Sequence, residues 1–216
     1  MRFENTSVYN IYNAILGARN PMNSWNRSDS IFNGFNGKIE NTIIGKNDLG
    51  LMQKLIKAGS EHRKFLRQIF VAVDITAPLY WWKEADTYKV GIVADSTSTM
   101  HKLASTPITI DCFEMDDFED CKDDSNVYVS AIWAECITRL EKLRQKYNET
   151  KDKQYWKELI RLLPESWLQT RTVTMNYENL LNMYHQRKNH KLSEWSVDFI
   201  NWVKTLPYAK ELIIGE

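Results

Sequence analysis

The spacing of apolar residues along the chain predicts a mixture of helices and strands. Seven segments have apolar residues on one helical face, and several of them end at a glycine or a proline. These helices are expected at residues 7–16, 47–59, 79–86, 127–147, 155–163, 177–187 and 192–204. Gly17 and Gly59 are expected to end the first two, Asn47 or Asp48 to cap the second, and Asn176 to cap the helix that reaches Arg187.

Two segments have the pattern of strands. Apolar and less apolar residues alternate through 69–76, which is typical of a strand with one face more buried than the other. Residues 170–175 are rich in β-branched and hydroxyl side chains and predict a second strand. Because helices and strands are mixed without a regular βαβ alternation, the fold class is α+β.

The first 47 residues are unusually rich in asparagine. Ten asparagines fall between Asn5 and Asn47, and Asn-Pro and Asn-Gly pairs predict turns. The segment also carries Trp25 and Phe32, which are too apolar for a solvated tether. We therefore expect residues 1–216 to form a single domain in which 1–47 make one N-terminal helix and an ordered loop.

Charge and length exclude several classes of protein. The 216 residues include 28 Lys+Arg and 28 Asp+Glu, so the chain lacks the basic balance of a nucleic-acid coat or a membrane-surface protein. No apolar run approaches the roughly 18 residues of a membrane span, and residues 1–10 lack the apolar core of a signal peptide. We expect a cytoplasmic protein that binds neither nucleic acid nor membrane.

Cysteines and histidines give no metal pattern. Three cysteines without a CxxC spacing predict reduced thiols, and His185 and His190 are not at ligand spacing with a cysteine or a carboxylate. The eight carboxylates between Asp111 and Asp124 are expected to form a solvated surface segment. Common hydrolase, P-loop and dinucleotide-binding motifs do not occur.

Two groups of residues are candidate binding sites. The first is Lys89 with the hydroxyl-rich loop that includes Asp95, Ser96, Thr97 and Ser98, whose positive charge and hydroxyls suit phosphate and a pyrimidine edge. The alternative is a Ser/Thr turn that satisfies its own backbone.

The second group is a polar stripe on one helix. After Asn176, the side chains of Asn179, Asn182 and Gln186 share a face, and Arg187 follows at the end of the helix. Amides beside a guanidinium suit a flat heterocycle with carbonyl and imide groups. The alternative is an exposed polar face with a cation that the helix dipole favours.

Two long blocks of the sequence resemble the flavin-dependent thymidylate synthases, the ThyX family. The first is LMQKLIKAGSEHRKFLRQIFVAVDITAPLYWWKE, and the second is LLPESWLQTRTVTMNYENLLNMYHQRKNHKLSEW, with its Thr-x-Asn and Leu-x-Asn-x-x-x-x-Arg pattern. The resemblance implies a mixed α/β domain with a central antiparallel sheet flanked by long helices. It also implies a homotetramer in which several subunits build each flavin site.

The resemblance assigns roles to particular residues. Asn176 and Asn182 fall where the family contacts FAD, and Arg187 falls where an arginine binds and polarises the uracil of dUMP. The substrate-binding positions that the resemblance implies are Asp95, Ser96, Thr97, Ser98, Arg161 and Arg187.

The chain also departs from the family's pattern. Thr87, Tyr88 and Lys89 stand where the family has Arg-His-Arg, so only the last charge is kept. Thr99 replaces an arginine that meets the substrate. We expect Lys89 and Arg67, helped by the neighbouring residues 62 and 63, to supply replacement charge to the flavin phosphates.

The activity implied is reductive methylation of dUMP at C5, with methylenetetrahydrofolate, FAD and NADPH. In that reaction Arg187 would stabilise negative charge on the pyrimidine, and no protein nucleophile is required. Two alternatives stay open: a related enzyme that modifies another pyrimidine nucleotide, and a protein that binds a nucleotide without catalysis.

Overall fold

A computed structural model describes residues 1–215 and has the expected α+β class. The strands are β1 (Arg2–Tyr9), β2 (Ile31–Asn36), β3 (Ile39–Ile43), β4 (Phe70–Pro78), β5 (Val93–Ser96) and β6 (Leu168–Asn176). The α-helices are α1 (Ile11–Arg19), α2 (Lys46–Lys57), α3 (Leu79–Ala85), α4 (Thr99–Lys102), α5 (Val129–Thr150), α6 (Lys153–Arg161), α7 (Tyr177–Arg187) and α8 (Ile200–Lys204). Short 3-10 helices are η1 (Asn20–Met22), η2 (Trp25–Arg27), η3 (Lys64–Gln68) and η4 (Ile110–Cys112), and π-helical turns are η5 (Glu194–Phe199) and η6 (Lys210–Ile214).

The six strands form one sheet in the order β2-β3-β1-β4-β6-β5. Strands β2 and β3 are an antiparallel hairpin, whereas β1 and β3 pair in parallel. The expected antiparallel sheet is therefore only mostly antiparallel. The parallel pair is allowed because the connection from β1 to β3 runs through α1 and β2, which is long enough for a crossover.

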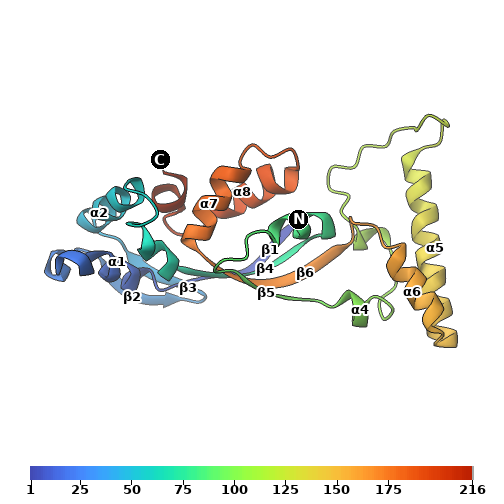
Figure 1. The fold of residues 1–216 in the computed structure, drawn as a ribbon, viewed down its shortest axis with the longest axis horizontal. Helices are drawn as coiled ribbons and strands as arrows, with labels where there is room; N and C mark the ends of the chain where they lie inside the picture. Colours follow the sequence, from blue (N-terminus) through green and yellow to red (C-terminus); the bar gives the residue numbers. More distant parts are fainter. Residues whose placement is uncertain (216) are drawn as a thin grey trace. The chain divides into compact units, whose positions relative to one another are not determined.

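By its internal contacts the chain divides into two units. The larger unit holds 2–75, 86–95 and 172–216, and the smaller holds Met1, 76–85 and 96–171. In the larger unit, α7 packs against η3 and η6 and lies beside α8 (Figure 1). The Tyr177 hydroxyl in α7 is fully buried and donates to the carbonyl of Pro207, and burial raises the pKa of this phenol.

The core of the larger unit follows the predicted pattern in β4. Val71, Val73 and Ile75 are at most 1% exposed, whereas Phe70 on the opposite face is 43% exposed. This confirms the alternation read from the sequence, because successive side chains of a strand point to opposite faces.

The smaller unit has its own apolar core beneath α5 and α6, which pack along each other. Its buried members are Leu103, Ile108, Phe113, Leu140 and Leu159. Trp133 and Trp167 each lie within 5.5 Å of the Phe113 ring, measured between ring centroids.

Several boundaries differ from the expectation. Ser7 lies in β1 rather than in a helix, and α1 continues past Gly17 to Arg19. Residues 1–47, expected to hold one helix and a loop, contain three strands as well. The last predicted helix, 192–204, starts as a π-helical turn before α8.

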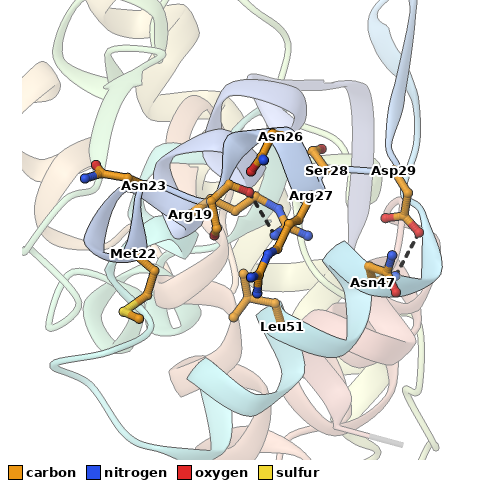
Figure 2. Close-up of a pocket in the computed structure, with 10 residues that line it drawn as sticks. Arg19, Met22, Asn23, Asn26, Arg27, Ser28, Asp29, Asn47 and Leu51 are labelled. Carbon is orange, nitrogen blue, oxygen red and sulfur yellow. Dashed lines mark hydrogen bonds between the residues drawn. The ribbon is translucent and has the colours of Figure 1, made fainter.

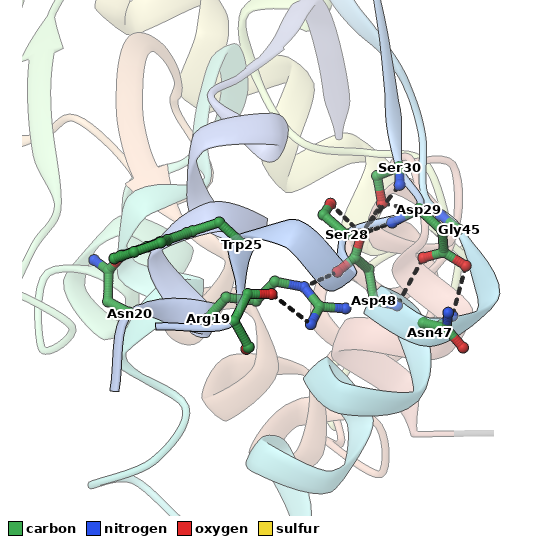
Figure 3. A network of polar contacts seen from close by, with 10 residues as sticks. Arg19, Asn20, Trp25, Ser28, Asp29, Ser30, Gly45, Asn47 and Asp48 are labelled. Carbon is green, nitrogen blue, oxygen red and sulfur yellow. Dashed lines mark hydrogen bonds and ion pairs between the residues drawn. The ribbon is translucent and has the colours of Figure 1, made fainter. Parts of the chain in front are cut away.

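The expected cap of α2 is also wrong. Gly45 precedes the helix, and the backbone N–H groups of Asn47 and Asp48 are held by the carboxylate of Asp29. Asp48 itself is fully buried and returns the contact: its carboxylate accepts hydrogen bonds from Arg19 and from the loop of Ser28 to Ser30 (Figure 3). The two carboxylates thus clamp this loop to α2 from both sides.

Within residues 1–215, no helix combines the length and the apolar character needed to cross a bilayer.

Candidate functional site

Two adjoining cavities in the larger unit contain most of the predicted binding residues. One, of about 390 Å³, is lined by Ser60, Arg63, Arg67, Gly91, Asn176 and Glu178, and the other, of about 230 Å³, by Thr87, Tyr88, Lys89 and Gln186. Both cavities are also lined by Val90, Asn179 and Asn182. The predicted polar stripe of α7 and the loop that contains Lys89 therefore meet in one place.

The start of α7 is fixed by a reciprocal cap. The Asn176 side chain accepts a hydrogen bond from the Asn179 backbone at 3.0 Å, and the Asn179 side chain accepts one from the Asn176 backbone at 3.1 Å. The Asn179 amide group also donates to the carbonyl of Val90 at 2.7 Å. The predicted cap is confirmed, and it also anchors the loop that separates the two cavities.

Gly91 is required by this close approach. Its φ is +77°, a left-handed conformation that side chains rarely adopt. A Cβ there would also lie 3.0 Å from the Asn176 side-chain nitrogen. The loop can therefore reach the end of β6 only with glycine at this position.

A carboxylate organises the two arginines of the larger cavity. Glu178 accepts from Arg63 Nε at 3.2 Å and from Arg67 Nε, and Arg63 Nη2 also donates to Asn182 Oδ1 at 3.1 Å. Burial alone would raise the pKa of Glu178, but the hydrogen bonds and charges of the two arginines hold it below its usual range. The three side chains together carry one net positive charge.

Arg187 is held between aromatic rings beside the smaller cavity. Its Nε donates to the Tyr88 hydroxyl at 2.7 Å, and that hydroxyl donates to Gln186 Oε1 at 2.8 Å. The guanidinium carbon lies 5.3 Å from the ring centroid of Tyr88 and 5.0 Å from that of Trp195. Cation–π contacts and a hydrogen bond thus orient a planar, permanently charged group.

Other predicted residues have local roles or lie in the smaller unit. Asp95 belongs to the larger unit, in the exposed strand β5 rather than in the expected loop. Ser96, Thr97, Ser98 and Arg161 belong to the smaller unit.

The hydroxyls of this stretch are partly used by the backbone. The Thr97 hydroxyl donates to the carbonyl of Thr170 at 3.2 Å, and the Ser98 hydroxyl caps α4 by accepting from His101 N. Arg161 pairs with Glu158 one turn earlier in α6, at 2.5 Å. For Thr97 and Ser98, the alternative of a self-satisfied turn therefore describes the contacts seen.

The sequence analysis missed three partners in the site: Glu178, Tyr88 as a ligand of Arg187, and Trp195. A carboxylate in the first turn of a helix is a recognisable signal, because it favours the positive end of the helix dipole. The Arg187 partners lie 99 residues before it and 8 after it, and no local pattern links them.

A third, larger cavity of about 980 Å³ lies between the segment after α1 and the start of α2, away from the predicted residues. Met22 and Asn23 stand at one end of it, and Asp29 and Asn47 stand at the other (Figure 2). Arg19, at its edge, is already committed to Asp48 and to the Ser24 carbonyl. Within residues 1–215, no group of three or more His, Cys, Asp or Glu residues is placed to hold a metal ion.

The sequence itself matches no known family profile, and it matches no curated protein. The structure, in contrast, is similar to solved structures over nearly its whole length. Two crystal structures of the flavin-dependent thymidylate synthase ThyX from Helicobacter pylori, with FAD and dUMP, superpose with TM-scores of 0.68 and 0.71. The sequence identities are 18% and 17%, and the alignments cover 99% of this chain and 98% and 97% of those chains. The chain therefore has the ThyX fold.

Proposed function

We propose that this chain is an FAD-dependent thymidylate synthase-like methyltransferase that converts dUMP to dTMP with methylenetetrahydrofolate and NADPH. The observation that carries the proposal is Arg187, oriented by Tyr88 and Trp195 beside a cavity lined with the amides of Asn179, Asn182 and Gln186. A guanidinium and several amides match the carbonyl and imide groups of a uracil. The fold supports the same assignment by analogy.

The charges of the larger cavity fit the phosphates of a flavin dinucleotide. Arg67 spends only its Nε on Glu178, so within residues 1–215 both of its Nη groups remain for phosphate oxygens. Lys89 lines the adjoining cavity and has no carboxylate partner in the described chain. We therefore assign Arg63, Arg67 and Lys89 to the phosphates, and Asn176 and Asn182 to the polar edge of the flavin.

In this proposal the protein works by orientation and electrostatics. Arg187 holds the pyrimidine carbonyl and stabilises the negative charge that develops on the ring when C5 acts as the nucleophile. The side-chain amides of Asn179 and Gln186 fix the plane of the base. Bound FAD, reduced by NADPH, would supply the hydride that completes the methyl group.

Two alternatives follow from where the charges lie. Glu178 neutralises one of the two arginines of the larger cavity, which favours a protein that binds a nucleotide without turning it over. The second alternative is an enzyme that modifies another pyrimidine nucleotide, because Tyr88 and Lys89 shape the smaller cavity. We further propose a homotetrameric, cytoplasmic protein whose substrate sites include Asp95, Ser96, Thr97, Ser98 and Arg161.

A flavin-retention experiment tests the proposed function. The purified protein is incubated with FAD, desalted and measured by visible absorption, with and without dUMP. We expect retained flavin whose spectrum shifts when dUMP is added, and formation of dTMP once methylenetetrahydrofolate and NADPH are supplied. Retained flavin without dTMP would support the binding protein, and a folded protein that retains no flavin would exclude both flavin-dependent readings.

The charge of Glu178 should limit flavin affinity. In Glu178→Gln the two arginines keep a hydrogen-bond acceptor but lose the opposing charge, so FAD phosphates should bind about tenfold more tightly. Titration of FAD fluorescence measures this change. Glu165→Gln, which removes an exposed carboxylate paired with Lys83 in the smaller unit, is the matched control and should leave FAD affinity unchanged. Weaker FAD binding by Glu178→Gln would mean that the cavity does not receive the phosphates.

A further inference from the structure

Helix α5 has an unusually exposed surface for its length. It has 22 residues, about 33 Å, yet only Leu140 is fully buried. The side that faces its own unit carries the apolar residues of the core, including Trp133 and Leu143. The opposite side carries a stripe of small exposed residues, Ala131, Ala134 and Thr138.

An apolar groove runs beside this stripe. It has a volume of about 370 Å³ and is lined chiefly by Ile110, Met115, Phe118, Trp133 and Ile137. Ile110 and Phe118 are 47% and 40% exposed. Such a concentration of exposed apolar side chains around one groove is typical of a contact surface.

The charges around α5 are separated along its axis. The acidic segment 111–124 is bound to the N-terminal end of the helix, where Val129 N donates to the Cys121 carbonyl and Ser130 donates to Asp120. The C-terminal half of the helix carries Arg139, Lys142, Arg144 and Lys146. One end of this surface is therefore acidic, the other is basic, and the groove lies near the acidic end.

We propose that this face of α5 binds the same face of a second copy of this chain, with the two helices antiparallel and a two-fold axis near Ala134. The small residues allow the helices to approach closely, and the two apolar grooves then lie together across the axis. Lys142 and Lys146 lie about 12 and 18 Å beyond Ala134, so in an antiparallel pair they face the partner's acidic segment. A two-fold contact makes this charge pairing twice, which is how a self-complementary interface is built.

This inference does not depend on the proposed function. It rests on the groove, the exposed side of one helix and the separation of charge, all within the smaller unit. Charge complementarity selects a second copy as the partner, since the chain itself carries both the acidic and the basic half.

A disulfide placed on the two-fold axis tests the geometry. In full-length protein that carries Cys121→Ser, the variant Ala134→Cys should form an intermolecular disulfide on mild oxidation, because two Cβ atoms near the axis come within bonding range. Thr150→Cys is the matched control: it lies about 24 Å from Ala134, so its two copies would be about 48 Å apart and should not be linked. Non-reducing gel electrophoresis reads the result. Equal linking of both variants, or of neither, would overturn the proposal.

A charge exchange tests the pairing of the two ends. Lys142→Glu with Lys146→Glu should halve the mass of the assembly seen by light scattering after size exclusion. Adding Glu119→Lys and Asp124→Lys, two carboxylates without a bonded partner in residues 1–215, should restore it. A wild-type monomer at 50 μM, or a mass that both sets of changes leave unaltered, would contradict this interface.

Discussion

Replacing Arg187 with alanine should lower kcat/KM for dUMP by about 100-fold or more. The change removes the planar cation that the proposed reaction uses to bind the uracil and to stabilise its negative charge. Charged hydrogen bonds contribute about 1.5–3 kcal/mol to binding, and donors to a developing anion contribute about 2.7–4 kcal/mol. The loss should therefore appear both in dUMP affinity measured by calorimetry and in turnover.

Two milder changes separate the charge of Arg187 from its orientation. Arg187→Lys keeps a positive charge but loses the flat group that stacks on Tyr88 and Trp195, so it should recover little of the activity. Tyr88→Phe keeps the ring and removes only the hydroxyl that accepts from Arg187 Nε, and it should cost about tenfold in kcat/KM. Circular dichroism shows that each variant is folded. An unchanged dUMP affinity in Arg187→Ala would remove Arg187 from the site.

The parts of the site that the sequence predicted are those that one helix brings together. Asn176, Asn182 and Arg187 lie on α7, whose cap and apolar spacing are local signals. Glu178 and Arg63 are 115 residues apart, and Tyr88 and Arg187 are 99 apart. Only the folded chain sets such distant pairs, so no spacing in the sequence could have predicted them.

The N-terminal strands were missed for a different reason. The pair Asn36–Gly37 was read as a turn, and it does precede the two-residue connection between β2 and β3, with Gly37 at a φ of +63°. An Asn-Gly pair between apolar runs is a strong signal of a hairpin. The strands lacked a clean alternation, however, because the register shifts between Phe32 and Phe35 and both faces of β2 are exposed.

The buried ion pair of the larger unit should matter most for stability. Asp48→Asn should lower the free energy of unfolding by about 3–5 kcal/mol, the usual cost of leaving one partner of a buried pair alone. For a chain of this size that corresponds to a fall in Tm of about 6–20 °C. Asp48 has no exposed surface, and its carboxylate accepts from Arg19 at 2.5 Å and from the hydroxyls of Ser28 and Ser30 at 2.7 and 2.6 Å.

An asparagine of the same shape turns one acceptor into a donor, so it faces at least one of these donors with an N–H group. Arg19, only 4% exposed, then keeps its charge without a counterion. Asp29→Asn is the matched control, because it removes a charge from the other half of the clamp, at the exposed start of α2. Loss of such a cap costs about 1 kcal/mol, so its Tm should fall far less.

Acid unfolding gives an independent measure of the same carboxylate. Burial alone would raise the pKa of Asp48, but the hydrogen bonds from Ser30, Ser28 and Arg19 hold it below its usual range. A group whose pKa is lower in the folded state stabilises the protein above its unfolded pKa, about 3.9, and loses that contribution as the pH falls through the folded value. The difference in unfolding free energy between wild type and Asp48→Asn should therefore be constant from pH 5 to 8 and shrink below pH 4. A difference that stays unchanged below pH 4 would show that the loss in the variant comes from packing rather than from the charge.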